Sequence, residues 1–255
     1  MISNARLKAL IALKQKKNRQ KEGKFLVEGD NLIASALENG FDPEEIFYSV
    51  DYGKNNIDSL IGNRPTKKVF ISSPQMRKLS DVSTPPGIAA LMPTFKYTLD
   101  DFATSSKLLY MDQVSDPGNA GTLIRNGCAF GFDAVIFGQG SCELYNPKLL
   151  RSTAGYIFQI KALENISYEK LSALKQQGFK LISGDSNARL SIEDQKCPEK
   201  AVLVLGNEPR GVSEEAKNLV DLALRIPLSS KVDSLNVAAA GAILMYWARN
   251  ARLAR

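Results

Sequence analysis

Short apolar runs alternate with amphipathic stretches along most of this chain. In its first part, the runs at 24–29, 44–50, 67–72 and 87–93 predict buried strands. Between them, residues 31–40 predict a helix that Asp30 can cap and Gly40 can end. Ser73 and Pro74 predict the start of another helix, because proline suits the first helical turn. This alternation predicts an α/β domain over residues 1–95.

A polar segment, residues 93–106, follows and is interpreted as a linker. Beyond it, strands are predicted at 107–114, 133–139, 156–162, 179–185, 201–207 and 222–228, and helices near 118–130, 146–154, 168–177, 213–220 and 234–252. The strands are continuous apolar runs, which is typical of a parallel sheet covered on both faces. The sequence therefore predicts a second α/β domain over residues 106–255.

Charge is distributed unevenly. The net charge is +6, yet the first 24 residues hold eight Lys/Arg against one acid, Glu22. Such a segment suits a polyphosphate partner, because each phosphate contact releases counterions; a solvated helix face is the alternative. The predicted RNA contacts are Arg6, Lys8, Lys14, Lys16, Lys17 and Arg19.

Several classes of protein are disfavoured by composition. No window approaches the roughly 20 apolar residues of a membrane span, so no membrane partner is expected. The charged N-terminus does not resemble a secretory signal; a transit peptide stays open, but a cytoplasmic protein is the simpler expectation. The chain has no histidine, and its three cysteines lack C-x-x-C spacing. Histidine-based catalysis is therefore excluded, and no metal site is expected.

Three glycine-bearing loops follow predicted strands, where open α/β sheets bind ligands. In the first, residues 112–131, Asp116 can cap a helix that places Asn119 in its first turn, with Arg125 about 9 Å further along. Because helical side chains lean toward the N-terminus, this Arg can reach back to the helix mouth. The pair suits a phosphate or hydroxyl group; an ordinary capped helix with a surface Arg is the alternative.

The second loop, residues 203–213, carries Gly206 and Glu208 in a turn before a helix that Ser213 can cap. It is neither a P-loop nor a dinucleotide fingerprint, and a plain βα turn remains possible. The third, residues 226–252, offers Ser234 or Asn236 to the start of a long apolar helix. That helix is expected to be buried, either in the domain core or in a homodimer interface.

Together and in this order, the three loops resemble the motifs of the SpoU/TrmH family of RNA 2′-O-ribose methyltransferases. DPGNAGTLIRNGCAFG resembles the first motif of the family, GNEPRG the second and IPLSSKVDSLNVAAA the third, and the resemblance covers residues 106–255. The segment KFLVEGDNLIASAL resembles the start of an L30e-type substrate-binding domain. Ser230 departs from the glycine frequent at its position, which leaves the shape of the adjoining loop open.

The resemblance implies a parallel-sheet domain with a deep trefoil knot, a homodimer, and S-adenosylmethionine as methyl donor. The implied donor-binding residues are Leu205, Gly206, Ile226, Leu228, Leu235 and Asn236, and the implied catalytic set is Arg125, Asn119, Glu208, Ser234 and Asn236. Because a guanidinium stays protonated up to a pH of about 12, we interpret Arg125 as orienting or polarising the ribose hydroxyl rather than acting as a simple base.

Ribosomal RNA is the expected substrate, by analogy with family members that carry a substrate-binding domain. Two alternatives stay open at this point. One is methylation of transfer RNA. The other is an RNA-binding or ribosome-assembly protein that keeps the scaffold without catalysis.

Overall fold

The computed structural model describes residues 2–249, and the chain divides into two compact units. Unit 1 comprises Met1–Phe95 and Tyr145–Gln159; unit 2 comprises Lys96–Leu144 and Ile160–Arg255. The first boundary falls within the predicted linker. The contiguous division into 1–95 and 106–255 differs for residues 145–159, which belong to unit 1, where Tyr145 packs on Phe25 and Phe158 on Phe41.

Unit 1 is built on a four-stranded sheet with the order β1-β4-β2-β3. β1 and β2 each pair with β4 in antiparallel fashion, whereas β2 and β3 are parallel. The strands are β1 (Lys24–Glu28), β2 (Glu45–Tyr48), β3 (Lys67–Phe70) and β4 (Ile88–Pro93); the helices are α1 (Asn4–Ala12), α2 (Lys16–Glu22), α3 (Asp30–Glu38), α4 (Lys54–Ile61), α5 (Ser73–Leu79), α7 (Pro147–Ser152) and the 3₁₀ turn η2 (Tyr156–Phe158).

The two faces of this sheet are covered by different helices. α1 and α5 place Leu10, Leu13 and Met76 against Phe47 and Leu91 of the sheet. α3 packs against β1 and β4 and against η2. The basic N-terminal segment is therefore two helices, α1 and α2, folded into unit 1. Neither was assigned as an element from sequence: α2 (KKNRQKE) has no apolar residue, and α1 is a short helix that is stabilised mainly by packing.

Two local expectations for unit 1 need correction. α3 begins at Asp30 with Gly29 as its N-cap, so Asp30 is the first helical residue rather than the cap. The predicted strand at 156–162 forms only from residue 161 onward, in β7 (Lys161–Ile166), because Ala154 and Gly155 have φ of 51° and 93° and turn the chain into η2 first. Gly40 follows the C-cap of α3 with φ of 78°, as predicted.

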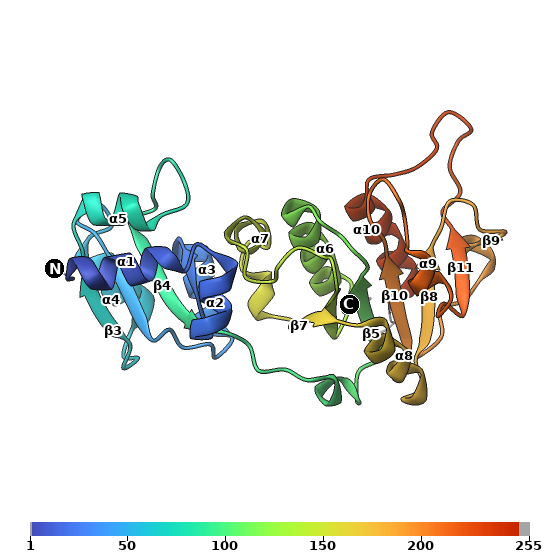
Figure 1. The fold of residues 1–255 in the computed structure, drawn as a ribbon, viewed down its shortest axis with the longest axis horizontal. Helices are drawn as coiled ribbons and strands as arrows, with labels where there is room; N and C mark the ends of the chain where they lie inside the picture. Colours follow the sequence, from blue (N-terminus) through green and yellow to red (C-terminus); the bar gives the residue numbers. More distant parts are fainter. Residues whose placement is uncertain (1, 250–255) are drawn as a thin grey trace. The chain divides into compact units, whose positions relative to one another are not determined.

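Unit 2 is built on seven parallel strands in the order β7-β6-β5-β10-β8-β11-β9. The strands are β5 (Lys107–Met111), β6 (Ala134–Gly138), β7 (Lys161–Ile166), β8 (Lys180–Gly184), β9 (Leu190–Ser191), β10 (Ala201–Leu205) and β11 (Leu222–Arg225); the helices are α6 (Pro117–Ala129), α8 (Tyr168–Gln176), α9 (Glu214–Lys217), α10 (Val237–Ala248) and the turns η1 (Leu99–Phe102) and η3 (Ile192–Asp194). Figure 1 shows β5, β10, β8 and β11 side by side. The predicted parallel sheet is confirmed.

Helices cover both faces of this sheet, as the continuous apolar strands predict. α8, α9 and Phe102 of η1 pack on the face formed by alternate residues such as Tyr110 and Val204. Because Phe102 is buried, the predicted linker is not wholly irregular. α6 and α10 cover the other face: a Cβ on Gly241 would overlap Leu123 of α6 and would stand 2.8 Å from Leu205 of β10. The predicted helix at 234–252 begins at Val237, and its last residues lie outside the described part of the chain.

Candidate active site

The turn after β10 is closed by its own backbone. Asn207 N–H donates to the Gly211 carbonyl at 2.9 Å, and Gly211 N–H donates to the Asn207 carbonyl at 2.8 Å. A Cβ on Gly206 would overlap the backbone of Gly211. Only glycine therefore fits at 206, and the reason lies in the turn itself rather than in room for a ligand alone.

Side chains from all three motif loops meet in one hydrogen-bonded chain. Asn119 Nδ2 donates to Glu208 Oε1 at 2.7 Å, and Asn236 Nδ2 donates to Asn119 Oδ1 at 3.1 Å. Helix caps hold the two amides in place: Asp116 accepts from the Asn119 N–H, and Asn236 Oδ1 accepts from the Ala238 N–H at 2.9 Å. Residues 117 positions apart in the sequence are thus brought to the same point.

The buried carboxylate of Asp112 holds the end of the turn between β10 and α9 by hydrogen bonds. Asp112, fully buried at the end of β5, accepts from the Ser213 N–H at 2.7 Å and from the Tyr168 hydroxyl at 2.8 Å. The same hydroxyl lies 2.9 Å from Ser213 Oγ. Asp112 therefore ties the strand before the first motif to the helix start after the second. Its role is not visible in the sequence, because a single Asp at a strand end is an ordinary feature.

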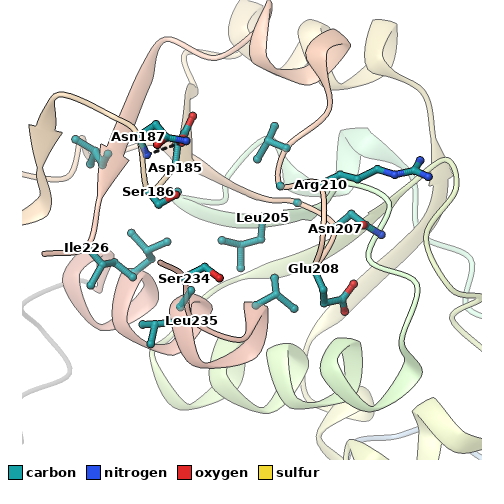
Figure 2. Close-up of a pocket in the computed structure, with 18 of the residues that line it drawn as sticks. Asp185, Ser186, Asn187, Leu205, Asn207, Glu208, Arg210, Ile226, Ser234 and Leu235 are labelled. Atoms are coloured by element: carbon teal, nitrogen blue, oxygen red, sulfur yellow. Dashed lines mark hydrogen bonds between the residues drawn. The ribbon is translucent and has the colours of Figure 1, made fainter. Parts of the chain in front are cut away.

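A pocket of about 340 Å³ opens at the carboxyl ends of β8, β10 and β11. Figure 2 shows Leu205, Ile226 and Leu235 around it, with Ser234 and Glu208 nearby. Of the predicted donor-binding residues, those that line the pocket are Leu205, Gly206, Ile226, Leu228 and Leu235. Asn236 does not line it and acts as the N-cap of α10.

Only some of the predicted catalytic residues line the pocket. Glu208 and Ser234 line the pocket, while Asn119 is joined to Glu208 by its hydrogen bond. Arg125 is exposed on α6 and does not line the pocket. Within residues 2–249 its guanidinium makes no hydrogen bond or ion pair, so it is available to an anionic or hydroxylic ligand.

Sequence reasoning missed one wall of the pocket. Asp185, Ser186 and Asn187 follow β8 and line it, and Asp185 Oδ1 accepts from the Asn187 N–H at 2.9 Å (Figure 2). The signal that could have found them is their place after a buried strand of the same sheet. Asn207 and Arg210 also line the pocket; the buried Oδ1 of Asn207 has no hydrogen-bond partner in the described part of the chain.

The residues around this pocket fit S-adenosylmethionine. Apolar side chains offer a face to its adenine, the ends of β8 and β10 bring backbone groups to the rim, and the volume lies within the range for small-molecule sites. Cys142 is not a nucleophile here, because burial raises the pKa of its thiol to about 12, an effect that Asp116 and Glu208 reinforce. No group of His, Cys, Asp or Glu within residues 2–249 could hold a metal ion.

The predicted RNA contacts in unit 1 differ in their exposure and in the partners that they already have. Lys8, Lys16 and Lys17 are exposed. Arg6 pairs with Glu45 at 3.1 Å, and Lys14 pairs with Asp81 at 3.1 Å. Arg19 needs correction. Its side chain is buried and donates at 2.7 Å to the carbonyls of Leu13 and Lys14, so it holds the corner between α1 and α2 rather than facing a ligand.

An all-parallel sheet with a pocket at its carboxyl edge and these three joined motifs is the architecture of a SpoU-type methyltransferase. Residues 106–246 match the SpoU rRNA Methylase family, and residues 4–90 match the MRM3-like substrate binding domain. The chain belongs to the SpoU rRNA methylase family. No helix within residues 2–249 is long and apolar enough to cross a membrane.

Relatives match along nearly the whole chain. It is 34% identical over 248 residues to the 23S rRNA (guanosine(2553)-2'-O)-methyltransferase RlmP of Bacillus subtilis, covering 96% of each chain. It is 26% identical to the 23S rRNA (uridine(2479)-2'-O)-methyltransferase of Streptomyces viridochromogenes, covering 98% of this chain and 91% of the relative. The crystal structure of the SpoU methyltransferase AviRb from that organism, in complex with AdoMet, has a TM-score of 0.89 at 26% identity and covers 99% of each chain.

Proposed function

We propose that this chain transfers a methyl group from S-adenosylmethionine to a ribose 2′-hydroxyl of ribosomal RNA. The observation that carries the proposal is the chain of hydrogen bonds that runs from Glu208, which lines the pocket, through Asn119 to Asn236. The names of the relatives support the reaction, because two are 23S rRNA 2′-O-methyltransferases. They act on different nucleotides, so we propose the class of RNA rather than one position.

The methyl donor would lie against Leu205, Ile226, Leu228 and Leu235, with Gly206 keeping the backbone close. S-adenosylmethionine supplies a sulfonium methyl group that is already electrophilic, so the protein needs chiefly to place the ribose oxygen and let its proton leave. Ser234 and Glu208 line the same pocket and are placed to orient the two substrates.

Arg125 would orient the nucleotide by binding its phosphate and polarising the hydroxyl. Its exposed guanidinium is a permanent cation with a planar set of donors. Asn119 and Asn236 would keep Glu208 in position through the hydrogen bonds described above. In this arrangement no side chain acts as the general base, the hydroxyl proton passes to solvent, and placement accounts for most of the rate.

The test is incubation of the protein with labelled methyl donor and ribosomal RNA, followed by alkaline hydrolysis. A 2′-O-methyl mark yields alkali-resistant dinucleotides; a methylated base, or label found only on transfer RNA, would contradict the proposal. Arg125→Ala is expected to lower transfer by about a hundredfold or more while donor affinity is kept. The control is Lys170→Ala, which removes one exposed cation on α8, and it should leave both unchanged.

A donor titration separates the enzyme from the alternative, a non-catalytic RNA-binding or ribosome-assembly protein. Calorimetric binding of S-adenosylmethionine at micromolar concentrations is expected of the enzyme, and its absence would favour the binder. We propose that this protein acts in the cytoplasm, as expected for bacterial rRNA methyltransferases such as the relatives named above.

We also propose that the chain acts as a homodimer through α10. Ile243 and Tyr246 of that helix are 38% and 55% exposed although the helix is largely apolar. A second copy of the same face would cover them. The trefoil knot that the family resemblance implies stays a prediction.

A further inference from the structure

The basic residues of unit 1 gather on one layer of the fold. Residues 2–24 and 72–81 hold ten Lys/Arg and only two acids, Glu22 and Asp81. These segments contain α1, α2 and α5. Only the first segment stands out in the sequence, because Arg77 and Lys78 lie far along the chain.

Two contacts place α1 and α5 side by side. Near their starts, Gln75 Nε2 donates to the Ile2 carbonyl at 3.2 Å. Near their ends, Lys14 Nζ donates to the Ser80 carbonyl at 2.5 Å. Both helices bury their apolar residues against the same face of the four-stranded sheet. Their outward residues therefore face the same side, away from the sheet.

The cations of this layer differ in how far they are already engaged. Arg6, Lys14 and Lys24 have carboxylate partners, and Arg19 is buried. Six others are exposed and have no hydrogen bond or ion pair to any residue within 2–249: Lys8, Lys16, Lys17, Lys21, Arg77 and Lys78. Their long side chains are free to meet a ligand.

A second surface of unit 1, at the start of α3, has the opposite charge. An open cavity of about 550 Å³ there is lined by three acidic residues, Glu28, Asp30 and Asp51, and by one cation, Arg151. Bringing a polyanion to this cavity would set phosphates against carboxylates, which is repulsive. Charge therefore favours the basic surface of α1, α2 and α5 over this acidic cavity as the RNA site.

We propose that the outer side of α1 and α5, flanked by α2, is the surface that binds the phosphate backbone of the RNA substrate. Lys8, Arg77 and Lys78 form its centre. The proposal rests on the proposed function for the identity of the substrate. Lys and Arg contacts to phosphates gain free energy by counterion release, which is largely independent of base sequence, so the surface holds the RNA and does not read it.

The experiment compares two triple variants of the full chain. The first is Lys8→Gln, Arg77→Gln and Lys78→Gln. The matched control, Lys54→Gln, Lys170→Gln and Lys196→Gln, removes the same charge from exposed lysines elsewhere. Affinity for a 23S rRNA fragment is measured by filter binding between about 50 and 200 mM salt. Donor affinity is measured beside it by calorimetry.

The first triple is expected to weaken RNA binding at least about tenfold and to lower the slope of log affinity against log salt by about 2 to 3, because each lost phosphate contact removes about 0.7 to 0.9 from that slope. The control should match the wild type. Equal behaviour of the two triples, or no RNA binding by the wild type, would overturn the proposal. Failure of the proposed function would give a different result. Donor binding or methyl transfer would then be absent, while the first triple variant would still bind RNA more weakly than the control triple.

Discussion

At the residue scale, the site depends on a few polar side chains whose partners come from distant parts of the chain. Asn119 is the clearest case: its backbone is fixed by the Asp116 cap, which leaves its amide to join Glu208 and Asn236. Its immediate neighbours in sequence predict an N-terminal helix position. They do not predict the partners, which only the sheet order brings near.

Asp112 gives the first prediction. Asp112→Ala leaves the Ser213 N–H and the Tyr168 hydroxyl without their buried acceptor, so we expect the free energy of unfolding to fall by about 1–3 kcal/mol. Urea denaturation measures this fall. Donor affinity is expected to fall as well, because the turn that carries Glu208 loses its anchor.

The matched variant is Asp112→Asn. Its amide can accept from the Ser213 N–H and donate to the Tyr168 hydroxyl, so it should retain most of the stability and donor affinity. If Ala and Asn behave alike, the hydrogen bonds of Asp112 do not hold the turn, and that interpretation is wrong.

At the element scale, the turn between β10 and α9 gives the second prediction. Gly206→Ala would force the backbone of Gly211 to move, and we expect donor affinity measured by calorimetry to fall by at least about tenfold. Gly211→Ala is the comparison: this residue has φ of 67° but open space around it, so its cost is backbone strain alone, about 1–2 kcal/mol. A Gly206→Ala protein with unchanged donor affinity would show that the turn is not part of the site.

The corner between α1 and α2 gives the third prediction. Arg19→Met keeps the apolar stem but leaves the carbonyls of Leu13 and Lys14 without their donor. We expect a loss of about 2 kcal/mol in the free energy of unfolding. Lys16→Met, which removes an exposed cation of the same segment, should cost much less. Equal stability of the two variants in thermal or urea denaturation would count against the structural role of Arg19.

At the scale of the whole molecule, the exposed face of α10 gives the fourth prediction. We expect sedimentation velocity to show a dimer for the wild type and a monomer for Ile243→Asp, because a carboxylate would be buried unpaired in the interface. Leu190→Asp replaces an equally exposed apolar residue on β9 and should leave the dimer intact. A wild-type protein that stays monomeric at every concentration would rule out this interface.

The apolar runs in the sequence predicted most strands of unit 2. Five of them, β5, β6, β8, β10 and β11, fall within the predicted strands. A fully buried parallel strand has to be apolar on both faces, which makes it visible in sequence. The failures have local causes. The strand expected at 156–162 was placed too early, because the buried apolar residues of the 3₁₀ turn η2 look like a strand when the positive φ at Ala154 and Gly155 is unknown. α2 was missed because charged residues dominate it, and α1 was missed because the segment that contains it was interpreted by its charge alone.

The sequence by itself determined the class of protein and the positions of its three motif loops, because glycines, helix caps and apolar runs are local features that do not depend on distant parts of the chain. It also determined that an uncommonly basic segment begins the chain. The tertiary structure alone decided which motif side chains touch, that Asp112 supports them, that Arg19 is buried, and that Arg77 and Lys78 share a surface with Lys8. Each of these depends on contacts between residues far apart in sequence, and such contacts are set by the packing of whole elements, which no short segment encodes.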